Sequence, residues 1–153
     1  MFLTVHASIG ALLGDVIDEP YVAGFAGMLS HFIFDAVPHG DERIEKYLLA
    51  PERKRWVAAL FILDALTALA IVTLFYASGI TRHPAAFFTG ALGAVLPDVL
   101  DGCWHVSRKK FLPDFHTMHD AAHRFLKHPI HPVLGYIVQV SLFILVWLLV
   151  VWL

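Results

Sequence analysis

One apolar stretch of the sequence carries a histidine and an aspartate that share a helix face. His31 and Asp35 are four residues apart, and His39 follows one turn later, beyond Pro38. An imidazole and a carboxylate at this spacing can ligate one metal ion, or one can orient the other. Burying an ionised aspartate in lipid costs ~2.5–3.5 kcal/mol, so Asp35 needs a partner. The pair predicts a metal site, with a purely structural ion pair as the alternative.

Other apolar segments bring carboxylates and a histidine to the same depth. Asp98 and Asp101 are three residues apart at the end of one segment and share a helix face. His6 lies at the corresponding end of the first segment, where it is either a ligand or a solvated terminal histidine. Asp64 follows Trp56 by eight residues, which places it ~12 Å deep at a helical rise of 1.5 Å per residue. We therefore predict that Asp64 does not bind the metal and at most orients a residue that does.

A cluster of histidines precedes the last apolar segment. His116, His119 and His123 are spaced as one stripe of a helix, which predicts at least one ligand among them. A solvated amphipathic helix would have the same pattern. His128 and His131 each precede a proline, and they are more simply interpreted as interface residues.

The types of candidate ligand indicate which metal ions the site would prefer, and the net charge bears on the class of partner. Mixed imidazole and carboxylate donors suit Zn²⁺, Mn²⁺ or Fe²⁺ better than Ca²⁺ or Mg²⁺, and their number allows two or three ions. Cys103, the one cysteine, forms a Cys-x-His pair with His105, which is weak support for another site. The formal net charge of −2 gives no reason to expect a nucleic-acid partner.

These residues must be positioned by apolar helices. The 153-residue chain is 58% hydrophobic and 16% charged, which is more apolar than a soluble domain of this size. Its apolar segments cover 2–17, 21–37, 56–80, 84–100 and 132–153. The third and fifth can cross a hydrocarbon core of ~30 Å, whereas the others are near the lower length limit. We predict an all-α integral membrane helical bundle of about five transmembrane helices, with re-entrant helices as the alternative for the short segments.

Lysine and arginine indicate the orientation of such a bundle. With five spans, ten of the eleven basic residues lie on one side and only Arg82 lies on the other. The basic side is predicted to be cytoplasmic, in a bacterial-type inner membrane. It also holds the N-terminus and every histidine except His83, so the His/Asp cluster is cytoplasmic too. Residues 1–153 form one membrane domain, with a segment at 41–55 that is either an interfacial helix or a solvated linker, and a His-rich cytoplasmic region at 101–131.

Two stretches of the sequence resemble known metal-dependent families. Residues 24–39, with Ser30-His31, Asp35 and Pro38-His39, look like a segment of zinc-dependent phospholipase C-like proteins. Gly93 followed by Pro97-Asp98 looks like an element of bacterial membrane-bound metal-dependent hydrolases. Those hydrolases also begin with a histidine and a following glycine, as in 6–10, and carry a further histidine cluster, for which 116–123 is the best match.

The resemblance implies a set of metal ligands, with zinc as the preferred ion. The candidates are His6, His31, Asp35, Asp98 and one or more of His116, His119 and His123. We predict that Asp101 and His39 transfer protons in catalysis.

The leading functional hypothesis is a membrane-embedded hydrolase that acts on a phosphoester, such as a lipid-linked phosphate, at the cytoplasmic interface. Membrane lipid is then the partner and the source of the substrate. One alternative is a metal-binding or metal-transporting membrane protein without hydrolase activity. Against transport, only Asp15 and His83 are candidate ligands near the far side. The other alternative is a non-catalytic membrane scaffold.

Overall fold

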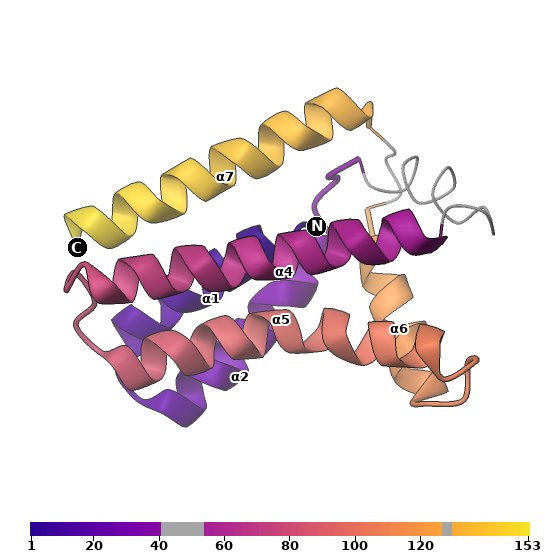
Figure 1. Ribbon diagram of the computed structural model, residues 1–153, viewed down its shortest axis with the longest axis horizontal. Helices are drawn as coiled ribbons and strands as arrows, with labels where there is room; N and C mark the ends of the chain where they lie inside the picture. The colour runs from indigo at the N-terminus through magenta and orange to yellow at the C-terminus, as the bar shows by residue number, and fades with distance from the viewer. Residues whose placement is uncertain (41–53, 127–129) are drawn as a thin grey trace.

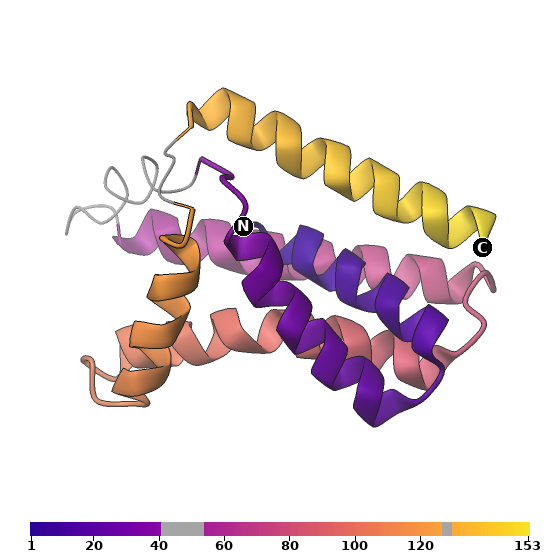
Figure 2. The ribbon, with the colours of Figure 1, turned by 180° about the vertical axis from the view of Figure 1, so that it is seen from behind.

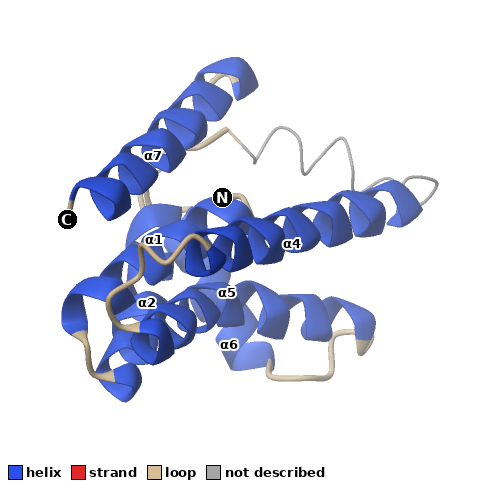
Figure 3. Cartoon of the chain, turned by 60° about the vertical axis from the view of Figure 1, so that its left-hand side comes forward, coloured by secondary structure: helices blue, strands red, loops and turns tan. Residues whose placement is uncertain are grey.

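The fold is entirely helical over the residues that the structure describes. A computed structural model of the chain describes residues 1–40, 54–126 and 130–153 (Figure 1). Its helices are α1 (Leu3–Ile17), α2 (Pro20–Asp35), α4 (Lys54–Ala77), α5 (Pro84–Val106), α6 (Pro113–His123) and α7 (Pro132–Trp152). Within these ranges there is no strand (Figure 3), which confirms the prediction of an all-α chain.

Three helices are long and apolar enough to cross a membrane. They comprise residues 55–77, 84–106 and 132–152, with 23, 23 and 21 residues. Many large apolar side chains on α4 and α7 are exposed, among them Leu66, Leu69 and Leu148. Such surfaces are typical of helices that face lipid, and they indicate a membrane protein. The α1 and α2 helices have 15 and 16 residues, so each is only about 22–24 Å long at 1.5 Å per residue.

Proline marks where several of these helices begin. Pro20, Pro84, Pro113 and Pro132 are the first residues of α2, α5, α6 and α7, a position where the missing N–H has no helical partner to lose. The α5 helix continues past the predicted end at residue 100, through an internal proline, to Val106. The apolar run stops at residue 100, but the helical backbone continues and carries Asp101 onto the same helix as Asp98. Residues 41–53 of the predicted interfacial segment lie outside the described residues, and residues 54 and 55 begin α4.

The α1 helix lies at the centre of the bundle, where it packs against α2, α4, α5 and α7 (Figure 2). Its Ala7 and Ala11 belong to a buried core with Phe87 of α5 and Trp147 of α7. Figure 2 shows α6 lying across one end of the bundle, where it contacts α2 and α5. The short first helix is therefore buried by its neighbours.

Asp64 ties α4 to the start of α1. Its carboxylate accepts hydrogen bonds from the backbone N–H groups of Leu3 at 2.6 Å and Thr4 at 3.2 Å, and from the Thr4 hydroxyl. The first N–H groups of a helix have no partner within the helix, and a carboxylate there also complements the helix dipole. Asp64 therefore caps α1 from a neighbouring helix, which gives this intramembrane carboxylate a structural partner.

Glycines allow α1, α2 and α5 to approach closely. A Cβ atom on Gly90 would lie 2.1 Å from the carbonyl oxygen of Gly10, and one on Gly27 would lie 2.2 Å from the carbonyl oxygen of Gly90. No side chain fits at such distances, so the backbones of these three helices touch at these positions. Small residues serve this purpose in membrane helices because close backbone packing replaces hydrophobic burial.

Two glycine substitutions in α2 test this packing. Gly27→Ala is expected to destabilise the protein by about 1–3 kcal/mol, since its methyl group overlaps the Gly90 backbone. Gly24→Ala is the matched control, because its methyl group meets nothing nearer than the Thr89 carbonyl oxygen at 3.5 Å. Thermal unfolding in mild detergent compares the two. Equal melting temperatures would contradict the close approach of α2 and α5.

Candidate metal centre

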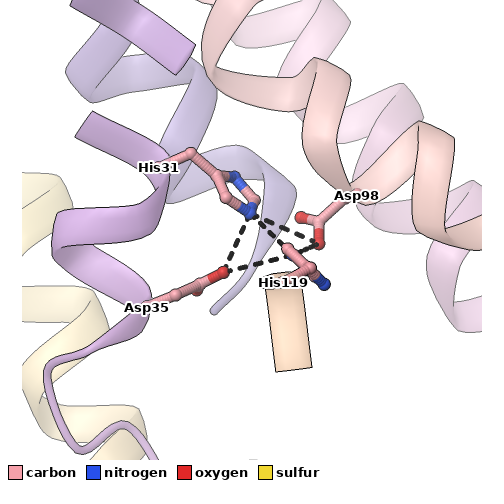
Figure 4. A group of neighbouring side chains, drawn as sticks. All are labelled: His31, Asp35, Asp98 and His119. Carbon is pink, nitrogen blue, oxygen red and sulfur yellow. Dashed lines mark hydrogen bonds and ion pairs between the residues drawn. The ribbon is translucent and has the colours of Figure 1, made fainter. Parts of the chain in front are cut away.

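Four side chains from three helices converge at the end of the bundle beneath α6. This central group consists of His31 and Asp35 of α2, Asp98 of α5 and His119 of α6 (Figure 4). One ligand atom from each lies within 4.8 Å of all the others. His31 Nε2 is 2.8 Å from Asp35 Oδ2 and 2.9 Å from His119 Nε2, and His119 Nε2 is 3.5 Å from Asp98 Oδ1. The structure thus brings together four of the predicted metal ligands.

A backbone hydrogen bond fixes the orientation of the His31 ring. Its Nδ1 lies 2.8 Å from the Ala94 carbonyl oxygen. A carbonyl oxygen only accepts, so Nδ1 donates its hydrogen, and in the neutral ring the lone pair of Nε2 faces the central group. Metal-ligating histidines are generally held in this way. The side chain is fully buried, and water therefore does not compete for this nitrogen.

One oxygen of Asp35 has close polar neighbours but no hydrogen bond. The Oδ2 atom is buried and without a hydrogen-bond partner among the described residues. Three imidazole nitrogens nevertheless approach it, from His31 at 2.8 Å, His123 at 3.2 Å and His119 at 3.6 Å. These imidazole nitrogens and the Asp35 oxygen that they surround form a donor set that a cation would complete. The residues present therefore fit a divalent transition metal.

Asp35 also belongs to a second group, with His39 and His123. His39 donates its Nδ1 hydrogen to the Val37 carbonyl oxygen at 2.7 Å, an arrangement that again turns Nε2 toward the group. The Met1 amine lies 3.0 Å from Asp35 Oδ1 and 2.9 Å from His39 Nε2. The positively charged Met1 amine thus contacts the Oδ1 atom of Asp35, whereas imidazole nitrogens surround the Oδ2 atom. His39, predicted to transfer protons, is thus placed among candidate ligands.

His6 lies against the same carboxylate from α1. Its Nε2 is 3.0 Å from Asp35 Oδ1, and its ring stacks on that of His31 with the centroids 4.1 Å apart. The other nitrogen, Nδ1, is buried without a hydrogen-bond partner in the described part of the chain. The structure therefore brings His6 to Asp35, as expected of a ligand or of a residue that orients one.

A third group, Asp101, His105 and His116, lies nearer the surface. His116 Nδ1 is 2.6 Å from Asp101 Oδ1, and His105 Nε2 is 3.4 Å from Asp101 Oδ2. Asp101 Oδ1 is also 3.7 Å from His119 Nδ1, so Asp101 lies between this group and the central one. His105 was predicted to pair only with Cys103, although its spacing of four residues from Asp101 on a continuous helix would have identified the closer partner.

The predicted stripe of three histidines is divided among the three groups. His119 joins the central group, His123 the second and His116 the third. His131 accepts a hydrogen bond from the Val133 N–H at 3.3 Å and caps α7. His128 lies outside the described residues.

Gln139 of α7 is a buried polar residue that was not predicted from the sequence. It accepts a hydrogen bond from the Phe2 N–H at 2.8 Å and donates one to the His39 carbonyl oxygen at 3.1 Å. It therefore fixes the segment that carries His39 against the start of α1. A glutamine within a long apolar span was the available signal, because such residues are costly without partners.

Burial and charge set the protonation of the two α6 histidines. Burial alone would lower the pKa of His119, but the carboxylates of Asp35 and Asp98 outweigh it and raise the pKa to about 9. Burial lowers the pKa of His123 to about 4, although Asp35 opposes this shift. At neutral pH His119 therefore holds a proton that a metal ion must displace, whereas His123 is neutral.

Comparison with known proteins gives no assignment. No protein-family model matches the sequence, and no match is found among curated proteins or solved structures. Any functional assignment therefore depends on the three His/Asp groups themselves.

Metal content tests the central group. Protein purified without chelator is expected to hold at least one Zn, Mn or Fe ion per chain by elemental mass spectrometry. His31→Ala and the near-isosteric Asp35→Asn should each lower metal content by roughly 10-fold or more, since changes even to residues that orient ligands have such effects. His83→Ala is the control, because His83 pairs with Asp18 at the opposite end of the bundle. Unchanged metal content in both site variants would refute the site.

Metal affinity should also depend on pH. Below the His119 pKa of about 9, Zn²⁺ must displace a proton, and its apparent affinity should rise by up to about tenfold per pH unit between pH 6 and 8. Calorimetry in buffers of different ionisation enthalpy measures the released proton. His119→Gln should remove this contribution. An equal proton release from the parent and from His119→Gln would contradict this assignment.

Proposed function

We propose that the chain is a membrane-embedded metal-dependent hydrolase that cleaves a phosphoester, such as a lipid-linked phosphate, at the membrane interface. The position of Asp35 carries this proposal. Its buried carboxylate is shared by two groups that contain His31, His119, His39 and His123. A carboxylate that belongs to two groups of imidazole donors would suit a site with more than one ion, and such sites are common in phosphoester hydrolysis.

The residues that would hold metal, with zinc as the preferred ion, are those of the central group together with His6, His116 and His123. Such ions supply Lewis-acid stabilisation of phosphoryl oxygens and make water nucleophilic near neutral pH. Asp101 is the group we assign to proton transfer, because it lies 3.7 Å from His119 and retains partial exposure at 18%. His39 is the second candidate for that role.

The proposed topology places these groups at the cytoplasmic face of a bacterial-type inner membrane. The five helices α1, α2, α4, α5 and α7 would form the bundle, with α1 and α2 near the lower length limit for a span. The excess of basic residues at the metal end supports this orientation. Arg108, Lys109 and Lys110 follow α5 at that end and would attract an anionic headgroup.

Metal transport without hydrolysis is the second candidate function, and the far end of the bundle argues against it. Asp15 is buried there and paired with Arg82 at 3.1 Å, and His83 is 2.7 Å from Asp18. The polar residues of that end are thus engaged with one another. Among the described residues, no group of candidate ligands lies at the far end.

Hydrolysis is tested in detergent micelles by release of inorganic phosphate from phosphatidic acid, a monoester, and of the water-soluble phosphorylated headgroup from the diesters phosphatidylglycerol and phosphatidylcholine. Zinc-loaded parent protein is expected to be active on at least one of phosphatidic acid, phosphatidylglycerol and phosphatidylcholine. Asp101→Asn should lower kcat by about 10²–10⁴-fold, as for loss of a proton-transfer group, while the central group still binds zinc. His83→Ala should retain full activity. Zinc-loaded parent protein with no activity on any of these lipids would reject the hydrolase and favour a metal-binding or scaffold protein, whereas equal activity of an active parent and Asp101→Asn would reject only the role of Asp101.

A further inference from the structure

An apolar groove runs beside the metal centre, between α4 and α7. Its volume of about 760 Å³ lies within the range of about 300–1,000 Å³ that is usual for ligand pockets. Leu60 and Phe61 line it on α4, Val140 and Phe143 on α7, and the first residues of α1 form its base. Nearly all of this lining is apolar, so the groove suits a hydrocarbon.

The groove closes toward the far end of the bundle. There, Phe75 of α4 stacks on Trp147 of α7 with the ring centroids 3.5 Å apart, and Phe143 packs edge-on against the same tryptophan. From this contact the two helices diverge toward the end that holds α6 (Figure 3). Both walls are helices that can span a membrane. In a membrane, lipid chains would therefore surround the groove.

The groove also reaches the metal centre. Asp98 of the central group lines it, with 17% of its side chain exposed. Met1 lines it as well, and the Met1 amine contacts Asp35. The other carboxylate in its lining, Asp64, is engaged in capping α1. One molecule can therefore contact apolar side chains along its length and the His/Asp cluster at one end.

We propose that this groove binds one acyl chain of a lipid whose phosphate headgroup lies at the central group. This inference rests on the proposed function and extends it, because it names the substrate class as acyl-chain phosphate esters and gives their orientation. The chain enters sideways from the membrane between α4 and α7, and its end lies toward Phe143 and Trp147. Water-soluble phosphate esters lack this interaction and bind weakly.

Photo-crosslinking tests the groove directly. The probe is lysophosphatidic acid with a diazirine at the end of its acyl chain, at low density in phosphatidylcholine vesicles that contain the zinc-loaded protein. Label is expected on the groove-lining parts of α4 and α7, near Phe143. An excess of unlabelled lysophosphatidic acid should compete, whereas glycerol phosphate, which has the headgroup without the chain, should not.

Matched tryptophan variants supply the control. Val140→Trp fills the groove and should lower labelling by about tenfold, whereas Ile144→Trp, one turn along α7 on an exposed face outside the groove, should leave it unchanged. Leu60→Trp fills the groove from the α4 wall and serves if Val140→Trp does not fold. Label spread evenly over lipid-facing surfaces, or unaffected by either filling variant, would overturn the inference.

Zinc content and phosphate release of the same samples separate this inference from the proposed function. Hydrolysis with an unlabelled groove overturns only the acyl-chain site. A labelled groove in a protein that holds no zinc overturns the hydrolase and supports a lipid-binding groove by itself. Loss of label on raising the protein-to-lipid ratio would show that a second copy of the chain covers the groove, and would also overturn the inference.

Discussion

The carboxylate of Asp35 must be accommodated inside an apolar helix bundle, where it is only 1% exposed. An ionised group in this position requires compensating partners. The structure supplies them from several directions: His6 from α1, His31 from α2, and His119 and His123 from α6. The crossing of α6 over the bundle end is what brings the last two within reach. The need to surround the buried Asp35 carboxylate with polar partners therefore constrains how these helices are arranged.

Close backbone packing makes this centre possible. Gly10, Gly27 and Gly90 let α1, α2 and α5 approach until a Cβ would collide with a neighbouring carbonyl oxygen. That approach brings the Ala94 carbonyl oxygen to the ring of His31. In lipid, burying apolar surface between helices gives little stabilisation. Van der Waals packing and interhelical hydrogen bonds hold the helices together instead. The same contacts thus stabilise the bundle and orient a candidate ligand.

The two ends of the bundle use polar residues differently. At the far end Asp15 pairs with Arg82, and Asp18 with His83, which joins α1 to the start of α5. At the near end, carboxylates and imidazoles converge with buried atoms left without hydrogen bonds. At the far end, each of these carboxylates thus has a nitrogen partner, and Asp15 has the guanidinium of Arg82. The near end also has a positive group, the Met1 amine beside Asp35, but more carboxylates and imidazoles gather there than this amine contacts, and this asymmetry is the physical basis of the functional proposal.

The sequence by itself determined the helical class, the long apolar helices, and the shared face of His31 and Asp35, since these follow from local periodicity and hydropathy. It also indicated that His6, Asp98 and the histidine stripe would gather at one end. Only the tertiary structure decided how the stripe is divided, why Asp64 caps α1, and that Gln139 binds the segment that carries His39. These outcomes depend on helix crossings between residues such as Leu3 and Asp64, or His39 and Gln139, that are 61 and 100 positions apart. Local spacing carries no information about such crossings, which are fixed by how the helices pack.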